Sequence, residues 1–415
     1  MSTHKVERFV ARAAGLARRA GMRTQLARER LDIRARVRRR KMVQHETGAR
    51  RPRFDAVLVP DKLATEHDVA IAERLLAAYR AASSAPQPPR AADRADVWTR
   101  IMAGQGRLAS ILRRGDPREL AAYLCNLSRH DASEGLEQGS YGFQRVMGDP
   151  SYRRFVALMV GDALVSLAEA VGALAVENPE QGPFGQSIHR DPAELVERIS
   201  ARVGTDVAPP DVDGGLLKID TGRGLFGGRD ANAIYTAHLL RQTTLDLRAP
   251  RICEIGAGSG RVAYWSRRFG LDSYTVVDLP HINVVQGYYL LKSLPGEEVS
   301  LYGEDPPGVA SGRVQILPAH AIADLQGPLF DLVLNQDSFP EIDPATVADY
   351  LRWITRCCEG SLLSINFESK PPYGRGRAHL SVPELVGEVG GFELTHRFPY
   401  WLRRGYVVEL YRVAR

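Results

Sequence analysis

The stretch that most constrains this chain runs from Arg251 to Asp278 and reads RICEIGAGSGRVAYWSRRFGLDSYTVVD. It predicts an apolar strand over 252–255, a glycine turn, a helix over 261–269, and a second strand that ends on Asp278. This order is half of a nucleotide-binding βαβ unit. Glycines let the backbone approach a ligand closely because they carry no Cβ. The acid at the second strand end is suited to accept hydrogen bonds from a ribose diol.

The glycine spacing separates two cofactor classes. Dinucleotides require G-x-G-x-x-G, whereas Gly256, Gly258 and Gly260 form G-x-G-x-G, with Glu254 two residues before the first glycine. E-x-G-x-G-x-G is typical of class I S-adenosylmethionine (SAM) methyltransferases, because the ammonium and sulfonium of SAM favour nearby acids. The alternative is a tight turn that binds no ligand. We predict that these four residues and Asp278 bind SAM.

The composition is that of an ordinary protein with ample core, because 415 residues allow two or three domains. Four irregularly spaced cysteines fit neither a disulfide framework nor a zinc site. The start, MSTHKVERFV, has no apolar signal core. The most apolar run, 155–176, contains Asp162 and Glu169 and predicts a buried helix. These features predict a cytoplasmic protein, and an oligomer is compatible with them.

Basic charge is concentrated at the N-terminus. Residues 1–53 hold 17 Lys/Arg against 4 Asp/Glu, so the remainder of the chain is net acidic. This basic helical leader predicts a solvated helix or arm, or peripheral docking on the anionic inner face of a membrane. A nucleic-acid arm is disfavoured because few aromatic residues interleave the charges.

The pattern divides the chain into three parts: the leader (1–53), a helical accessory or lid region (54–213) and a SAM-binding domain (214–415). The glycine-rich segment 214–230 is expected to form a loop over a ligand. After it the pattern predicts seven strands with intervening helices, at 252–255, 274–277, 314–317, 330–335, 361–365, 392–396 and 406–413. The last two strands are joined by a short connection, which favours an antiparallel pair. We therefore predict an α/β fold, a Rossmann-like class I methyltransferase sheet with one reversed strand near the C-terminus.

Ligands of such sheets lie beyond the carboxyl ends of the strands. The second strand ends at Asp278 and Leu279, which would hold the ribose. The third ends at Ala319 and His320, which would border the adenine. The fourth ends at Asn335, near the methionine end of the cofactor.

The fourth strand continues as NQDSFPE, which is not the N/D-P-P-Y of methylases that act on base or glutamine amino groups. No cysteine follows a proline, as cytosine C5 enzymes require. A hydroxyl, carboxyl or small-amine acceptor remains. A hydroxyl must lose its proton as it attacks, and the candidate general bases are Glu341, Asp337, His281 and Glu368. The three acids among them, Asp337, Glu341 and Glu368, could together hold Mg²⁺. Nothing in their spacing requires a metal, and we predict none.

Several further motifs resemble the bacterial sugar O-methyltransferases: YTVVDLPHINVVQGYYLL, LYGE, LNQDSFPEID, LLSINFES and YWLRRGYVVEL. The resemblance covers 112–413 and implies a SAM enzyme of polysaccharide or glycan biosynthesis. By position it implies that Trp401, Arg403, Gly405 and Tyr406 form a terminal motif. The chain departs from the family pattern at Ala257, Ser259 and Phe367.

Together these features predict SAM-dependent methylation of a hydroxyl on a sugar or glycan, which could be free, nucleotide-linked or lipid-linked. The alternatives are methylation of a small natural-product hydroxyl, RNA methylation that uses the leader, and a SAM-fold scaffold without activity.

Overall fold

The computed structural model describes residues 55–86, 101, 105–136, 139–178, 180, 187, 190–308, 311–368 and 380–414. The basic leader lies outside these residues, so its proposed roles at a membrane or nucleic acid stay predictions.

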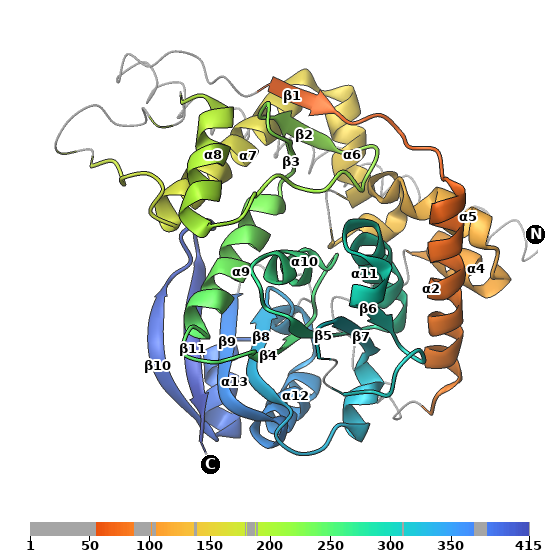
Figure 1. Cartoon of the computed structure of the whole chain (residues 1–415), viewed down its shortest axis with the longest axis vertical. Helices are drawn as coiled ribbons and strands as arrows, with labels where there is room; N and C mark the ends of the chain where they lie inside the picture. The colour runs from red at the N-terminus through yellow and green to blue at the C-terminus, as the bar shows by residue number, and fades with distance from the viewer. Residues whose placement is uncertain are drawn as a thin grey trace, which may run out of the picture.

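An eight-stranded sheet forms the centre of the molecule, in the order β10-β11-β9-β8-β4-β5-β7-β6 (Figure 1). Its strands are β4 (Arg251–Ile255), β5 (Ser273–Asp278), β6 (Val299–Leu301), β7 (Val314–Pro318), β8 (Phe330–Gln336), β9 (Cys358–Phe367), β10 (Phe392–Pro399) and β11 (Tyr406–Val413). Strand β11 is antiparallel to both of its neighbours, whereas the pairs from β9 to β6 are parallel. This confirms the predicted fold, a class I methyltransferase sheet with one reversed strand near its C-terminal end.

The prediction of seven strands is wrong by one. Strand β6 is only three residues long and pairs with β7 at the edge of the sheet. A strand of this length is too short to show an alternating pattern, so the sequence gives no local signal for it.

Helices cover both faces of the sheet. On one face lie α9 (Asp230–Thr243), α10 (Arg261–Arg268) and α11 (Pro280–Ser293), and on the other lie α12 (Pro344–Cys357) and α13 (Val382–Val389). The strands alternate between the two cores: Leu332 and Leu334 pack with the first group, and Val333 packs with the second. Alternation of this kind follows from the period of two in a β-strand.

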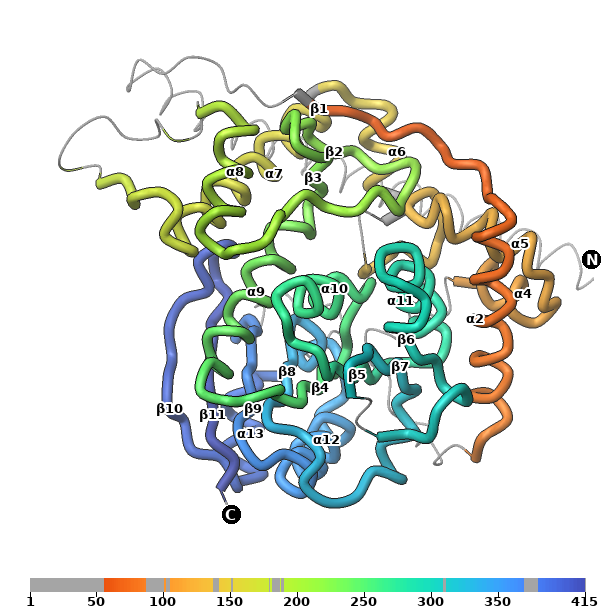
Figure 2. The backbone as a smooth tube through the Cα atoms, in the orientation of Figure 1, coloured from red at the N-terminus to blue at the C-terminus, as the bar shows by residue number. Residues whose placement is uncertain are grey.

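The predicted helical region packs over the α9–α11 face (Figure 2). Its helices are α2 (Glu66–Ser84), α4 (Gly106–Arg114), α5 (Pro117–Leu124), α6 (Gly139–Gly148), α7 (Pro150–Ala170) and α8 (Pro192–Val203). Thr65 and Asp68 form a capping box on α2, and Asp191 caps α8. Helix α6 was not predicted. Helix α7 covers most of the apolar run 155–176 and packs in the core. No helix of the described ranges is long and apolar enough to cross a membrane.

A second sheet joins the two predicted regions. Strand β1 (Asp55–Leu58) pairs with β2 (Leu217–Asp220), and β2 pairs with β3 (Leu225–Phe226), all antiparallel. The expectation that 214–230 forms only a loop is therefore wrong, since β2 and β3 lie within it. The β1–β2 pairing also crosses the expected boundary at 213, and the division into domains stays a prediction.

Candidate active site

The glycine turn between β4 and α10 lies at the carboxyl ends of the central strands. Gly256, Gly258 and Gly260 have φ angles of +76°, +57° and +83°, in the left-handed region that favours glycine. A Cβ on Gly256 would come 2.5 Å from the Cβ of Ser338, and one on Gly260 would come 3.4 Å from Leu290 of α11. Gly256 and Gly258 line a cavity. Gly260 instead allows α10 and α11 to pack closely.

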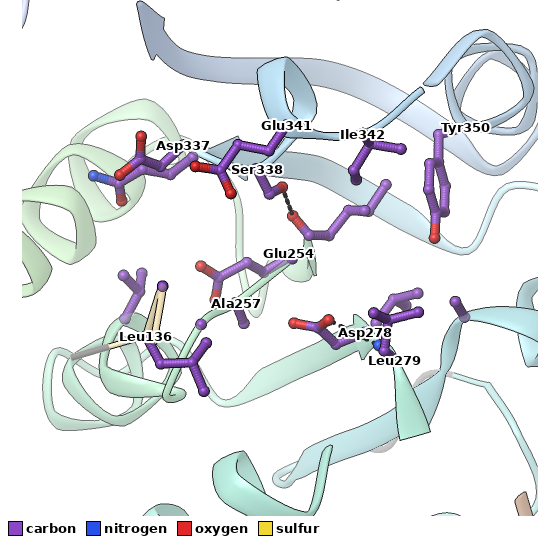
Figure 3. A pocket seen from close by; sticks show the side chains of 18 of the residues that line it. Leu136, Glu254, Ala257, Asp278, Leu279, Asp337, Ser338, Glu341, Ile342 and Tyr350 are labelled. Atoms are coloured by element: carbon purple, nitrogen blue, oxygen red, sulfur yellow. Dashed lines mark hydrogen bonds between the residues drawn. The ribbon is translucent and has the colours of Figure 1, made fainter. Parts of the chain in front are cut away.

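The cavity has a volume of about 980 Å³. Figure 3 shows Glu254 between two groups of side chains, with Asp337 and Glu341 on one side and Asp278 and Leu279 on the other. Leu279, Ala319 and His320 all lie in its wall. Their predicted contacts with ribose and adenine therefore remain geometrically possible and stay predictions.

Two acids flank the glycine turn, the buried Glu254 and the half-buried Asp278. Burial raises the pKa of Glu254 to about 8, although the Tyr274 hydroxyl donates to its Oε2 at 2.8 Å. Burial also raises the pKa of Asp278 to about 7. The Leu279 amide donates to Asp278 Oδ1 at 2.8 Å and the Gln286 amide to Oδ2 at 2.7 Å, which fixes the carboxyl group. A positive charge or a pair of hydroxyl donors placed beside them would draw both acids into their ionised form.

Asn335, predicted to contact the cofactor, lies behind the cavity wall. It is fully buried, and its Nδ2 donates to the Ile255 carbonyl at 3.0 Å and to the Ser338 hydroxyl at 2.6 Å. Its Oδ1 accepts from the Phe339 amide and from Asn366. These contacts assign Asn335 to holding the turn after β8 against the end of β4.

Asp337, predicted as a candidate base, is bound to the terminal motif. Its backbone is left-handed, with a φ of +69°. Arg403 Nη1 donates to its Oδ2 at 2.5 Å, and the Tyr406 hydroxyl donates to its Oδ1 at 2.5 Å. Both carboxylate oxygens of Asp337 are therefore already held by donors from the terminal motif.

Two of the other three candidate bases, Glu341 and His281, line the cavity. Glu341 lies in a 3₁₀ turn (Phe339–Glu341) after β8. Helix α12 is capped by Asp343, whose Oδ1 accepts from the Thr346 amide at 3.0 Å. Glu368 does not line the cavity and pairs with Arg397 at 2.7 Å. Within the described ranges, no three His, Cys, Asp or Glu side chains gather to hold a metal ion.

Sequence reasoning missed the part of the cavity wall contributed by earlier segments. Tyr79 and Ser83 of α2 line the cavity, as do Arg229 and Asn232 at the start of α9. Tyr79 and Ser83 are four residues apart, so both lie on the same face of α2. This face is polar, whereas the side of α2 that packs in the core is largely apolar. That spacing was the available signal, but nothing local indicates that α2 reaches the cavity.

No protein-family model matches the sequence, and no curated protein matches it. Among solved structures, the chain is similar to magnesium protoporphyrin IX methyltransferase from Synechocystis PCC 6803 with bound SAH (13% identity, 45% of this chain and 87% of that chain, TM-score 0.31). It is also similar to a 1,6-didemethyltoxoflavin-N1-methyltransferase from Burkholderia thailandensis (21%, 44% and 79%, TM-score 0.29). A third similar structure is a glycopeptide N-methyltransferase complexed with sinefungin (15%, 44% and 94%, TM-score 0.33).

The raised pKa of Glu254 predicts how stability changes with pH. The unfolded carboxyl ionises near its usual pKa of 4.5, whereas the folded one keeps its proton until about pH 8. Stability should therefore fall as pH rises between these values, by on the order of a few kcal/mol. Thermal melts of wild type and Glu254→Gln should show the variant gaining stability relative to wild type from pH 5 to pH 8. An identical pH dependence in the two proteins would contradict this.

Proposed function

We propose that this chain is a SAM-dependent methyltransferase that transfers a methyl group to a hydroxyl of a sugar or glycan. The observation that carries the proposal is one cavity that joins the glycine turn, the acids Glu254 and Asp278, and the candidate base Glu341. Gly256 leaves no room for a side chain, so the turn presents bare backbone to a ligand. The residues thus fit a cofactor with a ribose and a cationic amino-acid end.

Each residue has a distinct role in the proposal. Asp278 accepts hydrogen bonds from the ribose hydroxyls, and Glu254 offers a carboxylate to the ammonium group. When bound, SAM supplies an electrophilic methyl group. Glu341 accepts the proton that the acceptor hydroxyl loses as its oxygen attacks. Among the four predicted bases we favour Glu341, because Asp337 is held by Arg403 and Tyr406. His281 follows the strand end that we assign to the ribose, and Glu368 does not line the cavity.

Charged side chains in the cavity wall support a sugar over an apolar natural product. Asp337, Glu341, Arg229 and Arg403 all line it, and polar groups of this kind orient a ligand with many hydroxyls. A small aromatic or aliphatic acceptor would favour a deep apolar pocket instead. Attachment of the acceptor to a nucleotide or lipid, and membrane contact through residues 1–53, remain parts of the proposal.

Calorimetry with SAM and S-adenosylhomocysteine (SAH) tests the cofactor assignment. We expect micromolar binding by wild type, weakened by more than about tenfold in Asp278→Ala, which corresponds to about 1.4 kcal/mol. A folded wild type that binds neither compound would contradict the methyltransferase proposal.

Methyl transfer from labelled SAM to a panel of sugars, nucleotide sugars and phenols then tests the acceptor class. For an accepted sugar, Glu341→Gln should lower kcat by about 10²-fold or more, with SAH affinity unchanged. Transfer to phenols alone would overturn the sugar assignment, and an unchanged kcat would exclude Glu341 as the base.

A further inference from the structure

The start of α9 and the β10–β11 turn bring four polar side chains to one region of the cavity wall. They are Arg229, Asn232, Arg403 and Tyr406, and Asp337 lies among them. We propose, resting on the methyltransferase function above, that Arg229 and Asn232 form a subsite for an anionic group, a carboxylate or phosphate, of a ligand in this cavity.

The charge of Arg403 is already neutralised. Its Nη1 pairs with Asp337 and its Nη2 donates to the Tyr406 hydroxyl at 2.6 Å. Its guanidinium also lies over the Tyr406 ring, 3.8 Å from the centroid, where a cation–π contact fixes its orientation. The Tyr406 hydroxyl donates to the second Asp337 oxygen. Both oxygens of the one carboxylate therefore have a close donor.

Arg229 carries the surplus positive charge. Its Nη1 is 3.8 Å from Asp337 Oδ2, which is too far for a hydrogen bond. Its side chain is 40% exposed, and Asp337 is its only carboxylate partner in the described part of the chain. Two guanidinium groups thus face one carboxylate, which leaves one positive charge at the cavity wall.

Asn232 adds an unused hydrogen-bond acceptor one turn along α9. Its Oδ1 is buried, and the described residues offer it no donor. A buried carbonyl oxygen without a partner is costly, and a hydroxyl or ammonium group of a ligand would satisfy it. Arg229 and Asn232 lie three residues apart on one face of the helix, so a single ligand can reach both.

The chemistry that fits is an anion beside a hydrogen-bond donor. A guanidinium binds a carboxylate or phosphate through two parallel hydrogen bonds. Two ligands of the proposed reaction present this pair: an acidic sugar, with its acid group and hydroxyls, and the cofactor, with its own carboxylate and ammonium. A neutral sugar lacks the acid group that would pair with the positive charge of Arg229.

The test compares wild type with Arg229→Gln and Arg229→Lys by calorimetry, with Arg198→Gln as the control. Arg198 lies on α8 and pairs with Glu194 at an exposed site outside the cavity. Circular dichroism checks that each variant is folded. The ligands are SAH, 5′-methylthioadenosine (which lacks the amino-acid end), and glucuronate against glucose at matched ionic strength, with and without SAH.

If the anion belongs to the cofactor, Arg229→Gln should weaken SAH by about tenfold and leave 5′-methylthioadenosine unchanged. If it belongs to the acceptor, SAH should be unchanged, and wild type should bind glucuronate but not glucose. Arg229→Gln should then lose this preference. Arg229→Lys should retain part of it, because lysine keeps the positive charge but lacks the planar guanidinium that donates two parallel hydrogen bonds. Equal binding of every ligand by wild type and Arg229→Gln overturns the proposal. A wild type that does not bind 5′-methylthioadenosine would count against the methyltransferase function instead. The titration with glucuronate in the absence of SAH would still test the subsite.

Discussion

Gly256→Ala should abolish cofactor binding and destabilise the protein. The φ angle of Gly256 is +76°, where a residue with a Cβ costs about 1–2 kcal/mol. The new Cβ would also lie 2.5 Å from the Cβ of Ser338, so one of the two strand ends must move. Ser338 cannot move freely, because its hydroxyl donates to the Ile255 carbonyl at 3.2 Å and accepts from Asn335. We expect SAH affinity to fall by at least about 10²-fold, equal to roughly 2.7 kcal/mol.

Gly258→Ala is the matched control for this experiment. Its φ angle is +57° and no atom lies within 4 Å of the position of a new Cβ. The control therefore carries the backbone cost without the clash, and its melting temperature should fall less than that of Gly256→Ala. The double variant Gly256→Ala/Ser338→Gly removes the clash and should recover part of the lost stability. Near-normal SAH binding by Gly256→Ala would show that the turn does not hold the cofactor.

The sequence predicted those features of the fold that depend on local patterns. The strand, glycine turn and helix over 251–269 were predictable because each step has its own signal: an apolar run, glycines and helical spacing. The reversed strand β11 was predictable because the connection before it is too short for a parallel crossover. Strands β1 and β2 were missed because they pair with each other, with Asp55 opposite Asp220. A contact between residues so far apart in the sequence produces no local sequence pattern.

The candidate site divides in the same way. The acids at strand ends, Glu254 and Asp278, were identified because position along a strand places a side chain at the cavity. Asn335 was misplaced because its amide faces the hydrogen-bond network between strands, which depends on neighbours far away in sequence. Arg229 was missed because its importance comes from Asp337 and Arg403, on two other elements.

Arg261→Met should cause the largest loss of stability among the substitutions considered. Arg261 is the first residue of α10, and its side chain is only 7% exposed. It pairs with Asp213 at 2.7 Å and with Asp230 at 2.9 Å, whose side chains are 9% and 1% exposed. Removal of the guanidinium leaves two carboxylates buried without their cation, and loss of one partner of a buried pair costs about 3–5 kcal/mol. Urea unfolding of wild type and variant measures this difference in the free energy of unfolding.

The loss should depend on pH in a direction that identifies its cause. Without Arg261 the pKa values of Asp213 and Asp230 in the folded state should rise, because burial and mutual repulsion favour the protonated form. The unfolded carboxyls still ionise in their usual range, so the variant should lose most stability at neutral pH and approach wild type as pH falls toward about 4. A loss that is equal at pH 5 and pH 8 would attribute the effect to packing against Tyr289, whose ring centroid lies 4.7 Å from the guanidinium.

Removal of all three charges provides the rescue. In Arg261→Met/Asp213→Leu/Asp230→Asn no buried charge remains, and buried ion networks replaced by apolar groups of similar volume are often as stable as the original. Asparagine at 230 retains an oxygen for the Gly227 amide, which donates to Asp230 Oδ2 at 2.6 Å. Stability should therefore return. SAH affinity should stay below that of wild type, because Arg261 follows Gly260 directly and fixes the start of α10 next to the glycine turn. Recovery of both properties would mean that the network stabilises the fold without positioning the turn.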